Sequence, residues 1–476
     1  MGVWNPLRLL NLAALSLLRD EALAISTLEY LPTELFPPVF ILAFYGRHSE
    51  TLKAMVHAWP FVRLPLGGLM QMPNRGTLQA VLDGIDVLLA QKDRPRRCKL
   101  RVLDLRNTGQ DFWSMLSGDG SRGCSGSLMA PVAEDRSRTK QPLAPLEVFV
   151  ELCLKESNLD EFLTYLMSWV EQRKGSIHLC CKKLKIIVMP TENITKVLST
   201  VQLDCIQEVH INSTWNLSTL ATFAPFLGQM GNVQRLLLSH IHLSAFEEQQ
   251  QHVFQFTSQL LRLHHLRDLY MESPSFLEGC LDQMLRCLKT PLDNLSITNS
   301  LLTELDLTHL SQCSNISQLK GLNLSGVTLT NFSPELLQVL VEKVAATLQE
   351  LELDLCGIRN SQLEAILPAL SRCSQLRSFS LCGNLLSMAI MEKMLRHTAG
   401  LPCLSQELYP APQESYSSQG ILQPGRLIQL QAELLEILRD LGYPRTIWIS
   451  SSPCTHCGYN TFYHLEPVVY GYNTPA

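Results

Sequence analysis

The chain has 476 residues, of which 46% are hydrophobic and 17% charged, and its formal net charge is −5 at pH 7. This composition is typical of a globular protein, and the small negative charge gives no general reason to bind nucleic acid or an anionic membrane. The 15 cysteines are scattered, which favours reduced thiols and a cytoplasmic or nuclear location, or both. No stretch is long and apolar enough to span a bilayer.

Residues 1–98 contain no repeat, and they predict a short helical cap for the open end of a repeat array. Residues 7–18 resemble the core of a signal peptide, but Arg8 and Asn11 interrupt this segment and no basic start precedes it, so we expect no cleavage. Apolar residues recur at helical spacing until a Leu-Pro pair ends the pattern. They are Leu9, Leu12, Leu15, Leu18, Ala22 and Ile25, followed by Leu31-Pro32.

Residues 99–145 predict one isolated repeat strand, at Leu100, Leu103 and Leu105, followed by a loop. Residues 117–141 are rich in Gly, Ser and charge, which is the composition of a mobile loop. A basic run precedes the strand and is typical of a nuclear-import signal, a nucleic-acid patch or a solvated edge between elements. We favour the solvated edge and no direct nucleic-acid partner, because the strand begins at once. The run is Lys92, Arg94, Arg96, Arg97, Lys99 and Arg101.

Residues 146–400 predict a repeat array, and residues 401–476 predict its C-terminal cap. The pattern Leu-x-x-Leu-x-Leu-x-x-(Asn/Cys/Ser/Val)-x-Leu begins at Leu292, Leu319, Leu348 and Leu376, a period of about 28 residues that is typical of leucine-rich repeats. This pattern indicates an α/β horseshoe solenoid with parallel strands on its concave face and helices on its convex face. Asn384, at position nine, is expected to bond the turn and the adjacent coil. Looser copies begin at Leu184, Ile206, Val233 and Leu266, the first of them as Leu184, Ile187 and Met189.

Positions three, five and seven of each repeat point to the concave face, where a partner can reach them. Two acidic steps flank a small polar middle that includes Asn294, Ser296, Gly321 and Asn323. We expect this face to bind a basic or extended segment of a protein substrate, with Tyr270 as the aromatic anchor. The alternative is that these residues are merely solvated. The two steps are Asp268, Tyr270 and Glu272, and Glu350, Glu352 and Asp354.

A Cys-x-x-Cys pair near the C-terminus, Cys454 and Cys457, lies close to His456 and His464. A structural zinc ion needs four ligands, commonly from two paired motifs, and no second Cys-x-x-Cys is present. We therefore favour a turn that closes the C-terminal cap, with neither metal nor cofactor. The chain also contains no phosphate loop, no His-Glu-x-x-His and no nucleophile elbow, so it is not predicted to be an enzyme.

Several strings resemble the PRAME family, and the resemblance extends from about residue 7 to about residue 467. They are Leu17-Leu18-Arg19-Asp20-Glu21-Ala22-Leu23-Ala24-Ile25, Ala58-Trp59-Pro60-Phe61, Gln91-Lys92-Asp93-Arg94-Pro95-Arg96-Arg97, His178-Leu179-Cys180-Cys181, Ser371-Arg372-Cys373-Ser374-Gln375-Leu376 and Leu408-Tyr409-Pro410-Ala411-Pro412. The resemblance implies a leucine-rich-repeat protein of germ cells and some tumours. It implies a substrate receptor of a cullin-RING ubiquitin ligase, and a repressor of transcription linked to differentiation, apoptosis and proliferation.

The family's receptor role implies elongin B/C and a cullin-RING scaffold as partners of a monomeric receptor subunit, whose bound substrate is degraded by the proteasome. The contact is a short helix, Ser/Thr/Pro-Leu-x-x-x-Cys/Ala-x-x-x-aliphatic, that binds elongin C. Ser16, Leu17 and Ile25 match it, and Glu21 stands where a small residue is expected. A carboxylate at a small buried contact costs desolvation energy unless it points outward or is paired.

Leu31 and Pro32 resemble the start of a cullin-contact box and also the opening of an F-box, and both belong to ligase adaptors. The competing interpretation of Leu17 and Ile25 is that they are core residues of the helical cap. The competing function is a leucine-rich-repeat scaffold or transcriptional corepressor that recruits no ligase.

Overall fold

The computed structural model describes residues 9–70, 75–91, 95–108, 112–113, 145–155, 159–243, 249–442, 447–450 and 465–468. The chain divides into two compact units: Met1–Leu184 with Glu192–Cys205, and Lys185–Thr191 with Ile206–Ala476. The expected loop at residues 117–141 and the cysteine motif at residues 454–457 lie outside the described residues. Within the described part of the chain, no helix combines the length and the apolar character needed to cross a membrane.

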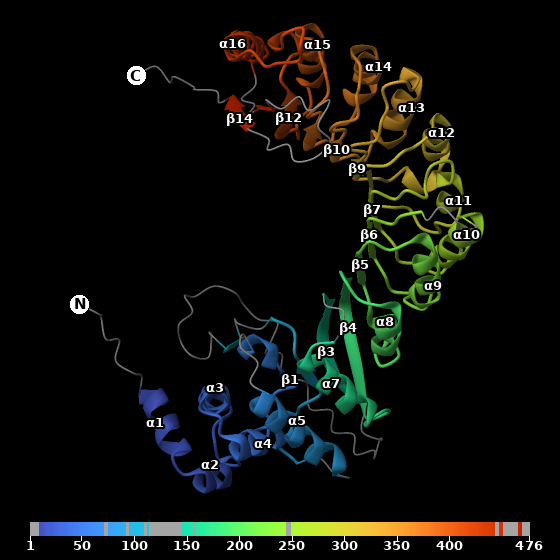
Figure 1. Cartoon of the computed structure of the whole chain (residues 1–476). Coiled ribbons are helices and arrows are strands. Elements are labelled where there is room, and N and C mark those ends of the chain that lie inside the picture. Colours follow the sequence, from blue (N-terminus) through green and yellow to red (C-terminus); the bar gives the residue numbers. More distant parts are fainter. Residues whose placement is uncertain are drawn as a thin grey trace, which may run out of the picture. The chain divides into compact units, whose positions relative to one another are not determined.

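The first unit begins with the predicted helical cluster and continues into a sheet (Figure 1). Its helices are α1 (Leu9–Leu18), α2 (Glu21–Thr27), α3 (Phe36–Gly46), α4 (Ser49–His57), α5 (Arg75–Ala90), α7 (Glu161–Glu171) and α8 (Thr191–Leu198). Its 3-10 turns are η1 (Thr33–Leu35), η2 (Leu66–Leu69) and η3 (Leu203–Cys205). The strands β1 (Arg63–Leu64), β2 (Val102–Asp104), β3 (Leu146–Leu154) and β4 (Ile177–Ile186) are neighbours in that order.

An aromatic cluster forms the core of the helical part of this unit. Trp59 is fully buried, its ring centroid lies 5.1 Å from that of Phe40, and Phe40 stacks on Trp113 at 5.7 Å. The Trp59 indole N–H donates to the carbonyl oxygen of Arg63 at 3.0 Å, so its polar atom is satisfied inside the core. Large aromatic side chains therefore hold α3 and α4 against the start of the sheet.

The second unit alternates strands with helices. Its strands are β5 (Glu208–Asn212), β6 (Arg235–Ser239), β7 (Asp268–Glu272), β8 (Asn294–Thr298), β9 (Gly321–Asn323), β10 (Glu350–Glu352), β11 (Ser378–Ser380), β12 (Gln406–Pro410), β13 (Ile447–Ser450) and β14 (Leu465–Val468). Its helices are α9 (Leu217–Leu227), α10 (Gln249–Leu260), α11 (Leu281–Leu285), α12 (Glu304–Gln312), α13 (Pro334–Val344), α14 (Asn360–Leu370), α15 (Met388–Thr398) and α16 (Pro424–Asp440), with η4 (Ser314–Ile316) and η5 (Gln413–Ser415).

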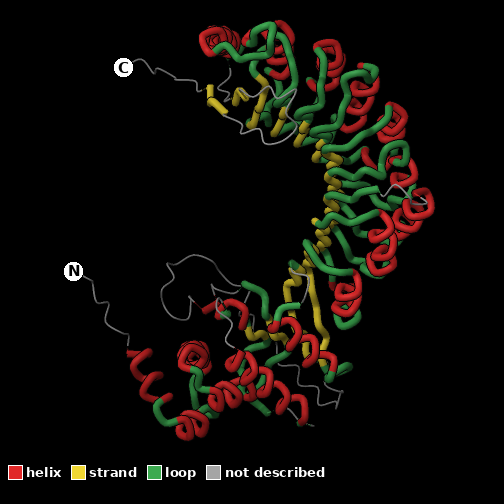
Figure 2. The backbone as a smooth tube through the Cα atoms, in the orientation of Figure 1, coloured by secondary structure: helices red, strands yellow, loops and turns green. Residues whose placement is uncertain are grey.

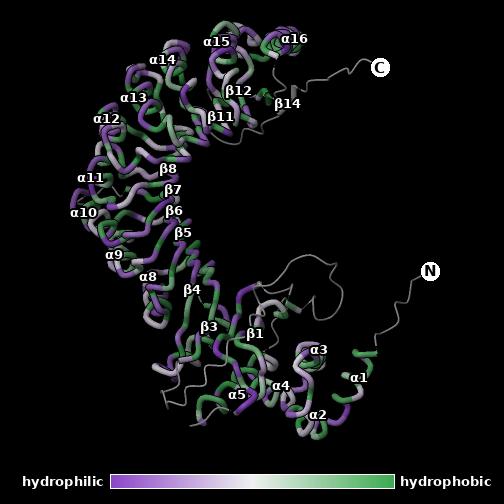
Figure 3. The backbone as a smooth tube through the Cα atoms, turned by 180° about the vertical axis from the view of Figure 1, so that it is seen from behind, coloured by the Kyte–Doolittle hydropathy of each residue, from purple (hydrophilic) through white to green (hydrophobic). Residues whose placement is uncertain are grey.

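In this unit the strands line the concave side and the helices the convex side, which confirms the predicted α/β leucine-rich-repeat solenoid (Figure 2). Among the described strands, β5 to β13 pair in parallel, and β14 pairs with β13 in the antiparallel direction. Hydrophobic and hydrophilic stretches alternate along each coil (Figure 3). The predicted inward leucines are buried: Leu292, Leu295, Leu348, Leu351 and Leu376 are each at most 1% exposed. Burial between stacked coils therefore holds the repeats together.

One looser copy has the wrong register. We predicted a repeat strand at Leu184, Ile187 and Met189, but β4 ends at Ile186, so Ile187 and Met189 lie beyond it. The buried residues of β4 begin at Ile177, earlier than the repeat pattern implies, and two consecutive exposed lysines precede Leu184 and Ile186, so this long strand does not follow the repeat spacing. The strand expected around Leu103 is present as β2, and it is not isolated, since it pairs in parallel with both β1 and β3.

Asn384 occupies position nine of its repeat and bonds two coils. Its amide nitrogen donates to the carbonyl oxygens of Leu353 and Leu381, both at 2.8 Å, and its oxygen accepts from the N–H of Ile358 at 2.9 Å. We expect Asn384→Ala to lower the free energy of unfolding by about 3 kcal/mol, because three buried backbone groups lose their partner. Urea denaturation followed by circular dichroism measures this change.

Ser300 provides the matched control for Asn384, because it occupies the same repeat position. Its hydroxyl is buried without a hydrogen-bond partner. Ser300→Ala should therefore change the free energy of unfolding by less than about 0.5 kcal/mol. Equal losses in the two variants would contradict this account of position nine.

Candidate functional site

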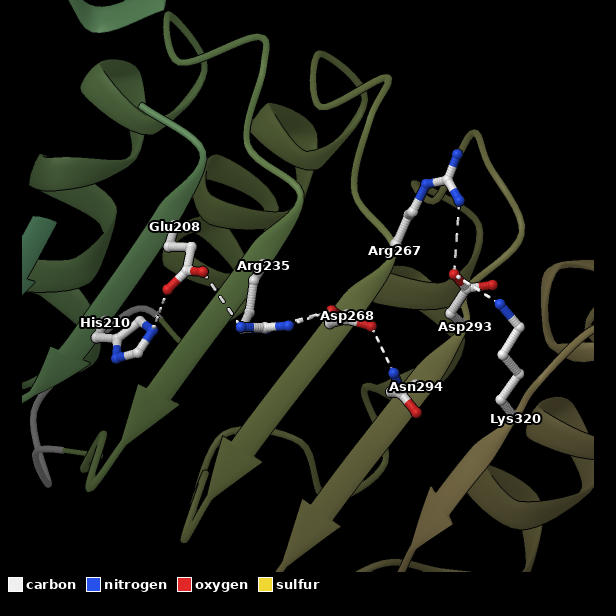
Figure 4. Close-up of polar contacts among 8 residues, drawn as sticks. All are labelled: Glu208, His210, Arg235, Arg267, Asp268, Asp293, Asn294 and Lys320. Atoms are coloured by element: carbon white, nitrogen blue, oxygen red, sulfur yellow. Dashed lines mark hydrogen bonds and ion pairs between the residues drawn. The ribbon is translucent and has the colours of Figure 1, made fainter. Parts of the chain in front are cut away.

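A ladder of charged and polar side chains crosses the concave face of the second unit (Figure 4). Strand register places Glu208, Arg235, Asp268 and Asn294 side by side. Arg235 lies 3.2 Å from Glu208 and 3.2 Å from Asp268, and the Asn294 amide nitrogen donates to Asp268 at 2.6 Å. Asp268 was predicted to face the substrate, but it is 9% exposed and paired on both sides. It therefore stabilises the sheet rather than offering a free charge.

A second ladder lies one residue earlier in each repeat. Asp293 lies 3.6 Å from Arg267 and 3.3 Å from Lys320, so one carboxylate bridges two cations (Figure 4). These side chains are more exposed than Asp268, and exposed pairs of this kind contribute little to stability. Their effect is to neutralise the charge at this edge of the face.

The first ladder ends at Gly321, where a hollow of about 130 Å³ opens in the concave face. A Cβ on Gly321 would lie 2.5 Å from the side-chain oxygen of Asn294, so a larger residue here requires that side chain to move. The lining residues are Tyr270, Asn294, Leu295, Ser296, Gly321, Leu322, Asn323, Glu350 and Glu352. The structure thus brings together Tyr270 from one predicted acidic step and two carboxylates from the other.

The carboxylates near this hollow have no cationic partner in the part of the chain that the structure describes. Among the described residues no lysine or arginine forms an ion pair with Glu350, Glu352 or Asp354. Glu352 accepts a hydrogen bond from the Asn323 amide, and burial, followed by the charges of Asp354 and Glu350, raises its pKa. Negative charge is therefore held here without compensation, which favours a cationic ligand.

The remaining predicted residues of the two acidic steps differ in their contacts and their exposure. Asp354 accepts from the Ser380 hydroxyl at 2.5 Å and from the Cys382 N–H at 2.7 Å, and burial raises its pKa despite these bonds. Glu272 is exposed but does not line the hollow. Tyr270 is half-buried, and burial followed by the charge of Asp268 raises its pKa. Its phenol therefore stays neutral and forms one wall of the hollow.

Glu208 was not among the predicted concave residues, although it is part of the first ladder. It stands at position three of the loose repeat that begins at Ile206, one strand before Arg235. Extending the repeat positions back from Arg235 would have identified it. The sequence does not single out Gly321, which ends the first ladder, because the role of this glycine depends on the direction of the Asn294 side chain.

In the first unit, the predicted docking residues lie on two helices. Ser16 and Leu17 belong to the last turn of α1, whereas Ile25 belongs to α2. The Asp20 carboxylate accepts from the N–H of Leu23 at 3.0 Å and so caps α2 as a new helix. The single short helix that the family resemblance implied is therefore interrupted at residues 19–20.

Glu21 is paired, and its partner lies on another helix. One of its oxygens accepts from the N–H of Thr51 at 3.0 Å and from the Thr51 hydroxyl at 3.2 Å, in the first turn of α4. A carboxylate at a helix N-terminus satisfies free N–H groups and complements the helix dipole. Glu21 therefore fastens α2 to α4, and it does not stand free at a docking surface.

Apolar side chains are nevertheless exposed on α1 and α2. Leu12 is 47% exposed, Leu15 40%, Leu23 50% and Ile25 37%, while Leu17 is half-buried. The core positions of these helices are occupied by other residues, namely Ala14, Leu18, Ala24 and Leu28. Ile25 is thus not a core residue, and the two helices present an apolar surface.

Leu31 and Pro32 precede η1, with Leu31 half-buried and Pro32 exposed. The Arg97 guanidinium donates to the carbonyl oxygens of Leu28, at 2.7 Å, and of Glu29 and Leu31. It also lies 4.7 Å from the centroid of the Phe36 ring. Our prediction of a solvated edge is therefore wrong for Arg97, which binds the end of α2. It holds for Arg96, Lys99 and Arg101, which are exposed, while Lys92 and Arg94 lie outside the described residues.

The fold and this site define a leucine-rich-repeat protein with an open recognition face and a helical N-terminal region. Comparison with protein families gives two matches, the PRAME N-terminal domain over residues 6–113 and the PRAME C-terminal domain over residues 146–471. The chain is 55% identical to PRAME family member 12 of Homo sapiens, over 98% of this chain and 97% of that protein. It is 53% identical to the human PRAME family member 8, over 98% and 99%. The chain belongs to the PRAME family.

Proposed function

We propose that this protein is the substrate-recognition adaptor of a cullin-RING ubiquitin ligase. The concave hollow binds a basic segment of a protein substrate, and α1 and α2 dock elongin B/C, so that the assembled ligase marks the substrate for proteasomal degradation. The chain itself catalyses nothing in this scheme and acts as a monomeric receptor subunit in the cytoplasm, the nucleus or both. The family resemblance adds repression of transcription, differentiation and apoptosis.

The observation that carries this proposal is the apolar surface of α1 and α2, in the segment that resembles an elongin-binding box. Its leucines are 40–50% exposed at positions 12, 15 and 23. Several exposed apolar side chains on these two consecutive helices favour an interaction surface. Full burial of one leucine side chain at an interface contributes about 2 kcal/mol, against about 8 kcal/mol for a micromolar complex, so these residues can supply part of the binding free energy.

The test is retention of purified elongin B/C by the full chain. We expect Leu17→Ala/Ile25→Ala to weaken binding at least tenfold while circular dichroism stays unchanged, because two apolar contacts are lost. Leu305→Ala is the matched control, since Leu305 is 63% exposed but lies in the second unit. Wild-type protein that never retains elongin would rule out this docking route.

One observation favours the second candidate, a scaffold or corepressor that recruits no ligase. Asp20 and Glu21 stabilise a break in the helix that elongin is expected to bind. The variant Asp20→Ala/Glu21→Ala removes both caps and restores a small residue in the box. In the adaptor scheme it binds elongin more tightly than wild type, because the helix no longer has to be rebuilt on binding. In the scaffold scheme neither protein binds.

The segment at Leu31 and Pro32 leaves a further route within the adaptor class. If the chain assembles a ligase through an F-box-like contact, Leu31→Asp removes ubiquitination of bound proteins, whereas Leu17→Ala/Ile25→Ala does not. Mass spectrometry of the proteins that co-precipitate with the full chain distinguishes the two routes, because it identifies whether elongin B/C or an F-box-binding subunit is recovered.

A further inference from the structure

Two cysteine sulfur atoms of the first unit lie against each other. The Sγ atoms of Cys180 and Cys205 are 3.2 Å apart, and both residues are free thiols. A disulfide bond has a sulfur–sulfur distance of about 2.05 Å, so small side-chain rotations bring the atoms together. We propose that Cys180 and Cys205 are a site of reversible oxidative modification, which a hydroperoxide converts into a disulfide bond.

Backbone hydrogen bonds fix the positions of both thiols. Cys180 lies in β4, and Cys205 is the last residue of η3. The N–H of Gln202 donates to the carbonyl oxygen of Leu179 at 2.9 Å, and Cys180 and Gln202 form an isolated parallel bridge. The N–H of Cys205 donates to the carbonyl oxygen of Gln202 at 3.1 Å. The two sulfur atoms therefore meet because the η3 turn is bonded to β4.

The exposure of the two residues determines which thiol is oxidised first. Cys180 is 3% exposed, whereas Cys205 is half-buried and can be reached from solvent. Burial, followed by the hydrogen bond with Cys205, raises the pKa of the Cys180 thiol, so that Cys180 stays protonated at neutral pH. Peroxide reaches the more exposed Cys205 before the buried Cys180, so Cys205 reacts first.

The reaction balances in two steps. The Cys205 thiol gives its proton to solvent and the thiolate attacks one oxygen of hydrogen peroxide; the O–O bond breaks, a sulfenic acid forms, and the departing hydroxide takes a proton back from solvent to become one water. The Cys180 sulfur then attacks the Cys205 sulfur, the S–O bond breaks, and the hydroxide takes up the Cys180 proton to leave as a second water. Two thiols are oxidised and one peroxide is reduced. A dithiol such as dithiothreitol reverses the change by thiol–disulfide exchange.

The neighbouring Cys181 is a matched control within the same strand. Successive residues of a strand point to opposite faces, and the Cys181 thiol donates to the carbonyl oxygen of Lys183 at 2.9 Å. Burial raises the pKa of this thiol to about 11. Cys181 is therefore close in sequence to the proposed pair but is not part of it.

The experiment treats the folded full chain with hydrogen peroxide, blocks free thiols with N-ethylmaleimide and digests with trypsin without reductant. Cleavage after Lys174, Lys182, Lys196 and Arg235 places Cys180 in residues 175–182 and Cys205 in residues 197–235. We expect mass spectrometry to find these two peptides joined, and reductant to separate them. Folded protein should form the link at least tenfold faster than protein in urea, because the fold positions the thiols.

Substitutions then assign the bond. The link should persist in Cys181→Ser and disappear in both Cys180→Ser and Cys205→Ser, and in Cys180→Ser the Cys205 sulfur should accumulate higher oxides. Amide exchange at residues 201–205 of the wild type should slow on oxidation and recover with dithiothreitol. Oxidation of Cys205 in folded wild-type protein without the link, or a link that forms only in urea, overturns the proposal.

Discussion

Replacing Glu350 and Glu352 by lysine is expected to abolish binding of a basic peptide to the second unit. The hollow next to Gly321 is lined by Tyr270 and these two carboxylates, and within the described structure no cation neutralises them. A charge-assisted contact to an arginine or lysine side chain contributes about 1.5–3 kcal/mol, so losing two of them weakens binding about a hundredfold or more. Fluorescence anisotropy with a labelled oligoarginine peptide of about eight residues measures the effect.

The control for this variant keeps the same change in net charge. Glu433 and Glu436 are exposed residues of α16, away from the hollow. Glu433→Lys/Glu436→Lys should alter peptide binding less than about threefold at 0.15 M salt, because distant exposed charges are screened. If both double variants bind equally weakly, general electrostatic attraction rather than this hollow holds the peptide.

The same binding should depend on pH. Burial and the neighbouring negative charges raise the pKa of Glu352 above its ordinary value, so this carboxylate takes up a proton at a higher pH than an isolated glutamate. A cationic peptide binds the charged form and favours loss of that proton. Affinity should therefore fall as pH decreases from neutral into the range where Glu352 is protonated, and Glu352→Gln should flatten that part of the profile.

Gly67→Ala is expected to destabilise the first unit strongly. Gly67 lies in η2, where its Cα faces the backbone at the end of β2. A Cβ there would lie 2.1 Å from the carbonyl oxygen of Arg106 and 2.4 Å from the carbonyl carbon of Leu105. These are backbone atoms that cannot rotate away, so η2 must separate from the strand. We expect a loss of about 3 kcal/mol or more in the free energy of unfolding.

Urea unfolding followed by tryptophan fluorescence measures this loss, since Trp59 and Trp113 are buried in the same unit. Gly231→Ala is the control, because a Cβ at Gly231 would meet no atom within 4 Å. That variant should stay within about 1 kcal/mol of wild type. An unchanged urea midpoint for Gly67→Ala would show that η2 does not pack against β2 in solution.

The repeat architecture was predictable because it depends on a local period. Leu292, Leu319, Leu348 and Leu376 recur about every 28 residues, and each is buried between coils as expected. Asn384 was also predictable, since an amide at position nine can bond only the turns around it. The pattern failed at Leu184, because the long strand β4 begins at Ile177 and ends at Ile186, out of register with the repeat.

Tyr270, Glu350 and Glu352 were placed on the right face by counting positions within each repeat. Counting did not show which of the predicted charges are free, because that depends on partners in neighbouring coils. Asp268 is paired with Arg235, 33 residues earlier, and with Asn294, 26 residues later. The hollow lies where the ladder of side chains reaches a glycine.

The amino-acid sequence by itself determined the stacking of coils, the residues that fill them and the face left open, since each of these follows from side-chain direction along short segments. Only the tertiary structure decided that Glu21 caps α4 through Thr51, that Arg97 closes the end of α2, and that Cys180 meets Cys205. These contacts join residues 25–69 positions apart in the chain. A short sequence period carries no information about contacts between residues so far apart in the chain. The packing of whole helices and strands determines these contacts.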